Sequence, residues 1–136
     1  MKAKITWLNG RTFVGESGSG HAIAMDGAPE NGGRNLGVRP MEMMLLGLGG
    51  CTAFDVVMIL EKSREKVTAC EVSLEAERAG EDPKVFTHVK MIYRLKGENL
   101  KPAAVERAIK LSSEKYCSAS KMFEKTATIE HEWFVD

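Results

Sequence analysis

Residues 40–64 read PMEMMLLGLGGCTAFDVVMILEKSR, and this apolar stretch decides the fold. Pro40 suits the first position of a helix, and the carboxylate of Glu42 would complement the helix dipole in the first turn. The pattern predicts one long helix that runs from Pro40 to about Arg64. Because apolar residues surround its axis, we expect the helix to be covered on most sides.

The same stretch is long enough to raise the question of a membrane. Between residues 43 and 60 the only charged side chain is Asp55, and 18 residues is the threshold length for a spanning helix. Three glycines and a central aspartate argue against insertion, since an aspartate there costs roughly 3 kcal/mol. We therefore predict a buried core helix and no membrane partner. The first residues contain no apolar run typical of a secretion signal, which favours a cytoplasmic protein.

Short strands are predicted on the N-terminal side of this helix. Asn9-Gly10 separates residues 5–8 from residues 11–14, which is a strong two-residue hairpin signal. A third strand is expected over residues 21–25. The glycine-rich segment 26–38 then forms a loop of a length that is usually functional in a compact domain.

Two alternating strands, a helix and a last strand are predicted on the C-terminal side. The segments around residues 70–77 and 89–96 alternate apolar residues with charged ones, acidic in the first and basic in the second. If the two strands pair, their solvated faces gain cross-strand charge matches. A helical pattern begins at Pro102 and continues to Lys125, with a break allowed near Cys117, and residues 128–135 form the last strand. The order predicts an α+β fold of one domain, residues 1–136, with two apolar helices against an antiparallel sheet.

The composition excludes some classes of function. Lysine plus arginine equals aspartate plus glutamate, 19 against 19, so no excess positive charge is available to bind nucleic acid. The three histidines have no metal-type spacing, so no metal site is predicted. The glycine-rich loop has no lysine in the position that nucleotide phosphates require, and no cofactor is predicted.

Three cysteines, at positions 51, 70 and 117, are an odd number that favours reduced thiols in a cytosol over a secreted disulfide framework. Cys70 shares the alternation of a half-buried strand, so we interpret it as a core residue. Cys51 follows three glycines in a helix, which indicates a crowded contact with another helix and an accessible thiol. Cys117 would favour a thiolate if a new helix begins beside it. Either of these two cysteines could instead be an ordinary buried residue.

Two motifs resemble those of the OsmC/Ohr family, closest to its YhfA-like branch. Residues 39–42 leading through Gly49-Gly50-Cys51 are similar to the first cysteine motif of the family, and residues 114–118 to the second. The likeness spans nearly the whole chain. It implies an OsmC-like fold and an intertwined homodimer with active sites at the subunit interface.

The resemblance also implies a function and a site. Cys51 would be the peroxidatic thiol and Cys117 the resolving thiol in the reduction of small organic hydroperoxides, with an external dithiol as reductant. The family's loop arginine corresponds best to Arg34, with Arg39 as a competitor. Its helix glutamate corresponds to Glu42, one position later than usual. A thiol inside a helix needs such a cation to become a thiolate near neutral pH.

Two alternatives stay open at this point. The chain could be a non-enzymatic dimer of the same fold that binds an apolar ligand or senses redox state. It could also be a structural dimer whose cysteines only pack the core.

Overall fold

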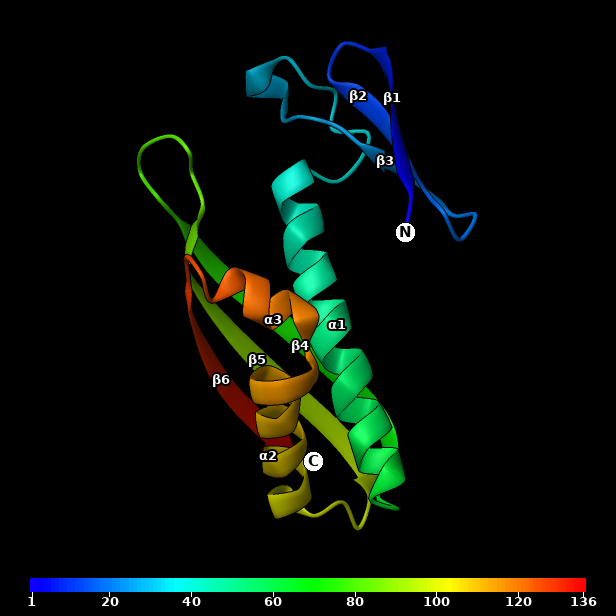
Figure 1. Cartoon of the computed structure of the whole chain (residues 1–136), viewed down its shortest axis with the longest axis vertical. Helices are drawn as coiled ribbons and strands as arrows, with labels where there is room; N and C mark the ends of the chain where they lie inside the picture. Colours follow the sequence, from blue (N-terminus) through cyan, green and yellow to red (C-terminus); the bar gives the residue numbers. More distant parts are fainter. The chain divides into compact units, whose positions relative to one another are not determined.

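The computed structural model describes all residues from 1 to 136 and divides into two compact units, residues 1–46 and 47–136. The elements follow in the order β1 (Ala3–Asn9), β2 (Thr12–Ser17), β3 (Ala22–Met25), a 3-10 turn (Pro29–Asn31), α1 (Pro40–Lys62), β4 (Lys66–Arg78), β5 (Phe86–Glu98), α2 (Pro102–Leu111), a π-helical turn (Ser112–Tyr116), α3 (Ser118–Phe123) and β6 (Thr128–Val135). Figure 1 shows the elements in the colours of the sequence. The predicted element order is confirmed.

The N-terminal unit contains a three-stranded antiparallel sheet with the order β1-β2-β3. The hairpin loop consists of Gly10 and Arg11, because Asn9 pairs with Thr12, so the predicted turn at Asn9-Gly10 is shifted by one residue. Gly10 has a φ of +53°, which other residues rarely adopt. The apolar side chains of β1 are more than half exposed, at 59% for Ile5 and 63% for Trp7. This sheet therefore presents apolar surface that its own unit does not cover.

The glycine-rich loop is a compact structure held by one buried carboxylate. The Asp26 side chain accepts hydrogen bonds from the Thr12 hydroxyl at 3.0 Å and from the backbone N–H groups of Gly27, Arg34 and Leu36 at 2.7, 3.4 and 3.3 Å. Burial alone would raise the Asp26 pKa, but these hydrogen bonds outweigh burial and hold the pKa below its usual value. The loop conformation, and with it the position of Arg34, thus depends on Asp26.

The C-terminal unit contains a second three-stranded sheet, β4-β5-β6. β4 and β5 are antiparallel, and their register places Glu71 opposite Arg94 and Glu75 opposite Lys90. This confirms the predicted cross-strand charge matches. β6 runs parallel to β5, and Lys90 also pairs with Glu132 of β6 at 2.7 Å. Hydrogen bonding and charge from Glu132 raise the Lys90 pKa.

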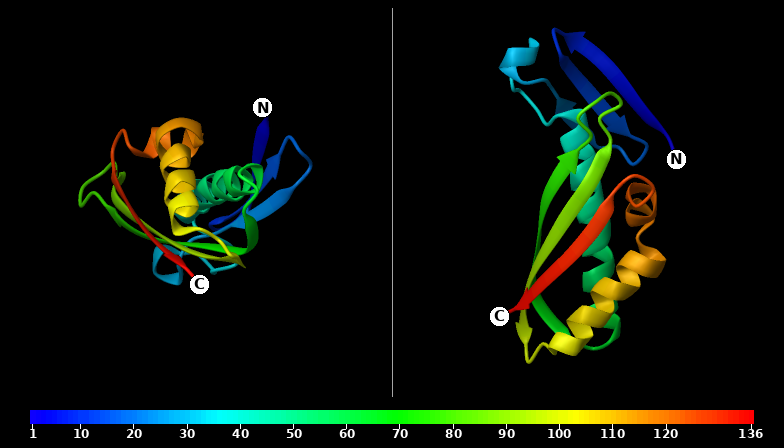
Figure 2. Two further views of the ribbon diagram at one scale, coloured as in Figure 1. Left: turned by 90° about the horizontal axis from the view of Figure 1, so that it is seen from below. Right: turned by 90° about the vertical axis from the view of Figure 1, so that its left-hand side faces the viewer.

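Helices cover one face of this second sheet. α2, α3 and the part of α1 that belongs to this unit lie on the same side of β4, β5 and β6 (Figure 2). The core consists of side chains from β5 and the helices that are at most 4% exposed: Val89, Met91, Tyr93, Leu95, Val105, Ala108, Ile109, Leu48, Val56 and Leu60. The Phe86 and Phe123 rings stack at 5.4 Å. Burial of this apolar surface is the main stabilising contribution.

Three predictions about the elements were wrong. The strands form two separate sheets and not one, and β6 is parallel to its neighbour, so the sheets are not purely antiparallel. The second helix is amphipathic and not apolar all round: Val105 and Ile109 are buried, while Glu106 and Lys110 on its other face are exposed. A helix that lies on a single sheet face needs only one apolar stripe.

α1 is apolar but is covered less than expected. By length and composition it could cross a membrane, and 28% of its most apolar 18-residue window is buried. Leu48, Val56 and Leu60 are completely buried in the C-terminal unit, so the helix is a core helix there. Phe54, on another face of the helix, is 70% exposed. The prediction that this helix is covered on most of its sides is therefore wrong for a single chain.

The glycines of α1 differ in what surrounds them. A Cβ atom on Gly49 would lie 2.7 Å from the Leu74 side chain of β4, so close packing within the chain explains this glycine. A Cβ on Gly47 or Gly50 would meet nothing within 4 Å. Since glycine in a helix costs about 1 kcal/mol relative to alanine, nothing within the chain itself accounts for Gly47 and Gly50.

Candidate functional site

The C-terminal unit brings Cys51 and Cys117 together, 66 positions apart in the sequence. Cys51 lies on α1, and Cys117 lies between the π-helical turn and α3. Their sulfur atoms and a carboxylate oxygen of Asp55 all lie within 4.8 Å of one another. Cys51 is half-buried, and Cys117 is 1% exposed. A small rotation of either side chain could bring the two sulfurs to bonding distance.

Helical spacing places Asp55 beside the thiols. It stands four residues after Cys51, one turn along α1, so both side chains project from the same helix face. Asp55 is 9% exposed, and its carboxylate accepts a hydrogen bond from the Ser112 hydroxyl at 3.0 Å. Ser112 is itself fully buried in the π-helical turn. The break in the second helix therefore orients a carboxylate toward the two cysteines.

The break also fixes Cys117. The Cys117 N–H donates to the Ser112 carbonyl at 2.8 Å, and α3 begins at the next residue. The break that the pattern allowed near Cys117 is present, a new helix follows it, and the residue that caps α3 is Cys117 itself. Its sulfur accepts the Ser120 N–H at 3.4 Å and lies 3.4 Å from the Thr52 hydroxyl.

These polar groups favour the thiolate of Cys117. Burial alone would raise its pKa, but the Ser120 hydroxyl, the Thr52 hydroxyl and the Ser120 N–H outweigh burial and hold the Cys117 pKa below its usual value. The Ser120 hydroxyl is completely enclosed and makes no hydrogen bond of good geometry in the structure. It is therefore available to donate to the Cys117 sulfur when that sulfur is ionised, or to a group bound beside it.

Cys51 lies in the opposite electrostatic environment. Burial is the largest effect and raises the pKa of its thiol. The Ala119 N–H acts in the opposite direction, and Cys117 and the charge of Asp55 raise the pKa further. A thiolate at Cys51 near neutral pH therefore needs a cation. Within this unit, Cys117 is the better stabilised of the two thiolates.

The other three predicted site residues belong to the N-terminal unit. Arg34 donates to the side chains of Asn9 and Thr12, the latter at 2.8 Å. Arg39 donates to the Asn35 side chain at 2.7 Å and to the Gly37 carbonyl at 3.2 Å.

Glu42 has a structural partner at the start of α1. Its carboxylate accepts the backbone N–H of Arg39 at 2.9 Å, which is half of a capping box. This contact fixes the direction in which the chain enters the helix.

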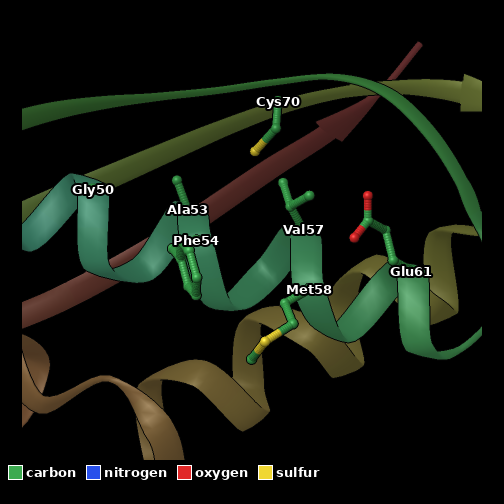
Figure 3. A pocket seen from close by; sticks show the side chains of 7 residues that line it. All are labelled: Gly50, Ala53, Phe54, Val57, Met58, Glu61 and Cys70. Carbon is green, nitrogen blue, oxygen red and sulfur yellow. The ribbon is translucent and has the colours of Figure 1, made fainter.

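Cys70 lies apart from the pair, in an open and mainly apolar groove between α1 and β4. Figure 3 shows Ala53 and Val57 of α1 on the side of the helix that faces Cys70, with Gly50, Phe54, Met58 and Glu61 completing the lining. The thiol is half-buried, as its alternating strand pattern predicted, and burial raises its pKa. The Cys51 pKa is raised as well, so this shift does not separate the two thiols; Cys70 differs because it lies outside the cluster of Cys51, Asp55 and Cys117.

Asp55, Ser112 and Thr52 are the site residues that the sequence reasoning missed. Asp55 entered that reasoning only as a charge that argues against a membrane helix. The signal that could have identified it was its spacing, one helical turn after Cys51. Ser112 gave no such signal, because its position follows from a π-helical turn that periodicity does not reveal.

The fold and this site define a class of protein. Residues 32–132 match the family model described as "OsmC-like protein", and the chain belongs to this family. This confirms the resemblance drawn from the two cysteine motifs and the OsmC-like α+β fold.

Individual relatives agree. The chain is 50% identical over 135 residues to Protein YhfA of Escherichia coli strain K12, covering 99% of this chain and 98% of the relative. A solved hypothetical protein of Aquifex aeolicus VF5 shares 29% identity, with a TM-score of 0.87 over 99% of this chain and 95% of that one. The organic hydroperoxide resistance protein OhrB of Bacillus subtilis has the same fold at 16% identity, with a TM-score of 0.66 over 98% of both chains.

Proposed function

We propose that this protein reduces small organic hydroperoxides through a Cys51/Cys117 redox pair. The observation that carries the proposal is the proximity of the two thiols, from distant parts of the sequence, in a chain of the OsmC-like family. The fold shared with the organic hydroperoxide resistance protein of Bacillus subtilis supports the choice of substrate class.

The reaction balances in three steps. The Cys51 thiolate attacks the distal peroxide oxygen, the O–O bond breaks, and the alkoxide takes a proton and leaves as an alcohol, so that Cys51 becomes a sulfenic acid. The Cys117 sulfur attacks the Cys51 sulfur and expels water, which forms a disulfide. An external dithiol then reduces the disulfide by exchange and becomes oxidised itself, which restores both thiols.

The position of Cys117 suits the second step. Its pKa is lowered, so a thiolate is available to attack the sulfenic acid, and it already lies beside Cys51. The spare Ser120 hydroxyl can donate to the sulfenic oxygen or to the departing water. The pair thus favours intramolecular disulfide formation.

Activation of Cys51 is assigned to an arginine. The charges that act on Cys51 from Cys117 and Asp55 are negative, so a cation has to come from elsewhere. We propose Arg34 for this role, held by the loop that Asp26 organises, with Arg39 as the competitor and Glu42 as an orienting carboxylate. Arg34 would act within its own chain or across a subunit interface, whereas Arg39, about 17 Å from Cys51 along the same helix, would act only across the interface.

The proposal includes a homodimer in the cytoplasm. Gly47, Gly50 and the 70% exposed Phe54 leave one face of α1 open, and glycines allow a second helix to approach closely. A partner chain on this face would give the apolar helix the cover that one chain lacks. The total interface should exceed about 2,000 Å², as obligate dimers do, and light scattering at micromolar protein should give twice the mass of one chain.

Hydroperoxide consumption is the test. Reduced protein with a dithiol and a chelator in the buffer should consume cumene hydroperoxide faster than hydrogen peroxide, and Cys51→Ser should abolish the activity. Cys70→Ser is the matched control and should retain it. If no variant or substrate shows turnover, the rival function of binding an apolar ligand gains support. The groove between α1 and β4 is the feature that favours this rival.

A further inference from the structure

We propose that the reduced pair and Asp55 form a binding site for a thiophilic divalent cation, with Zn²⁺ as the ion that fits it best. This site is a binding activity beyond peroxide reduction. It requires only that both cysteines are reduced, so it does not depend on the proposed function.

The three ligand atoms have the spacing that a single ion needs. They lie within 4.8 Å of one another. In a tetrahedral site with Zn–S distances near 2.3 Å and Zn–O distances near 2.1 Å, ligand atoms are about 3.6–3.8 Å apart. Side-chain adjustments of roughly 1 Å would therefore bring Cys51, Asp55 and Cys117 into coordination around one ion.

The chemistry of the donors selects the ion. Two thiolates and one carboxylate carry three negative charges when ionised, and soft sulfur ligands prefer zinc to magnesium or calcium. Three protein ligands leave the fourth tetrahedral position for water, and Cys51 is sufficiently exposed to admit the ion.

The surroundings of the cluster resemble the outer shell of a metal site. The Ser112 hydroxyl holds the Asp55 carboxylate at 3.0 Å, as outer-shell donors do for ligating carboxylates. The Ser120 hydroxyl, which is enclosed and has no partner, lies beside Cys117 and could donate to a bound water. These contacts distinguish the cluster from acidic groups that meet by chance on a surface.

Ion binding and disulfide formation exclude each other, because they use the same sulfur atoms. Zinc should therefore bind the reduced protein, protect Cys51 from alkylation, and leave when the pair is oxidised. Bound zinc would thus indicate the reduced pair, and released zinc the oxidised pair.

The experiment titrates the reduced full-length protein with ZnCl₂ against a chromogenic chelator. We expect one Zn²⁺ per chain. Cys51→Ser and Cys117→Ser should each weaken binding at least about 100-fold, Asp55→Asn about 10-fold or more, and Ser112→Ala about 10-fold, since loss of an outer-shell partner costs 10- to 100-fold in affinity. Cys70→Ser is the matched control and should bind as tightly as the unchanged protein.

Cobalt gives a readout independent of affinity. Co²⁺ in the reduced protein should show thiolate-to-metal charge-transfer absorption, which Cys51→Ser should diminish and Cys70→Ser should not. Protein oxidised with diamide to the disulfide should bind neither ion. If the Cys117 variant does not fold, the Cys51 and Asp55 variants still test the site.

Two results would overturn the site. The first is the absence of binding at stoichiometric zinc. The second is unchanged binding in both the Cys51 and Asp55 variants, which would place the ion on other residues. Because peroxide turnover is measured with a chelator present and zinc binding without peroxide, either proposal can fail while the other stands.

Discussion

Two buried carboxylates, one in each unit, have different surroundings. Asp26 accepts hydrogen bonds from one hydroxyl and three backbone N–H groups, whereas Asp55 accepts one, from Ser112. When backbone N–H groups occupy the acceptor sites of a carboxylate, the carboxylate fixes the loop. Few lone pairs then remain to bind a proton, an ion or a substrate. Asp55 keeps acceptor capacity and faces two thiols. The comparison indicates that Asp26 serves structure, whereas Asp55 belongs to the cluster for which chemistry is proposed.

The largest expected effect is on the thiols beside Asp55. Cys51→Ser should reduce hydroperoxide turnover by at least about 100-fold, because serine is a far weaker nucleophile near neutral pH than a thiolate. Cys117→Ser should stop turnover after one oxidation and leave a sulfenic acid on Cys51, detectable by a dimedone adduct. Asp26→Asn should act only through the loop that positions Arg34, so its rate per folded molecule should lie between that of the unchanged protein and that of Arg34→Ala. Full activity of the Cys51 variant would show that the cluster of Cys51, Asp55 and Cys117 does not carry out the reaction.

The second effect concerns the loop that Asp26 holds. Arg34→Ala should lower the rate of Cys51 oxidation by cumene hydroperoxide by about 100-fold, as expected when one charged donor to a reacting centre is lost. Arg39→Ala should change it little, since Arg39 lies at the start of α1, about 17 Å along the axis from Cys51 of the same helix. Stopped-flow measurement of the oxidation rate distinguishes them. A larger loss of rate in Arg39→Ala than in Arg34→Ala would show that Arg39 activates Cys51.

The third effect is on the packing of α1, the helix that carries Asp55. Gly49→Ala should change the free energy of unfolding by no more than about 1 kcal/mol, because the new Cβ displaces only the end of the Leu74 side chain and the helix gains about as much from alanine. Gly50→Ala is the matched control on the open face of the same helix. In a monomer it should stabilise the helix by about 1 kcal/mol, and in a dimer packed on that face it should weaken association. Urea unfolding and sedimentation at several protein concentrations separate the two outcomes.

The smallest effect is a change in pH dependence at Asp26. Its pKa is lowered in the folded protein, so its contribution to stability is complete above the unfolded value near 3.9 and is lost as pH falls through the folded pKa. The difference in thermal midpoint between the unchanged protein and Asp26→Asn should be constant near pH 7 and shrink below about pH 4. A difference that stays constant down to pH 2 would show that the carboxylate charge does not hold the loop.

The sequence predicted much of the fold because hydrophobic periodicity is a local property. The long helix from Pro40 and the last strand at 128–135 appear where their patterns predicted them. The division into two sheets and the parallel pairing of β6 could not be predicted, since strand partners depend on contacts between distant segments. Periodicity alone does not report such contacts.

The candidate site was predictable to a similar degree. The two cysteine motifs pointed to the two thiols that the structure brings together, and a helix break near Cys117 was left open. The role of Ser112 could not be predicted from the sequence, because a π-helical turn directs the Ser112 hydroxyl to Asp55. The same turn explains why Cys117 caps α3.

The most direct test of the central claim is a single-turnover reaction mapped by mass spectrometry. Reduced protein would receive one equivalent of cumene hydroperoxide without reductant, followed by alkylation of the remaining thiols and proteolysis. The account predicts a disulfide between Cys51 and Cys117, release of one equivalent of cumyl alcohol, and alkylated Cys70. Recovery of all three cysteines as alkylated thiols, or a disulfide that contains Cys70, would contradict it.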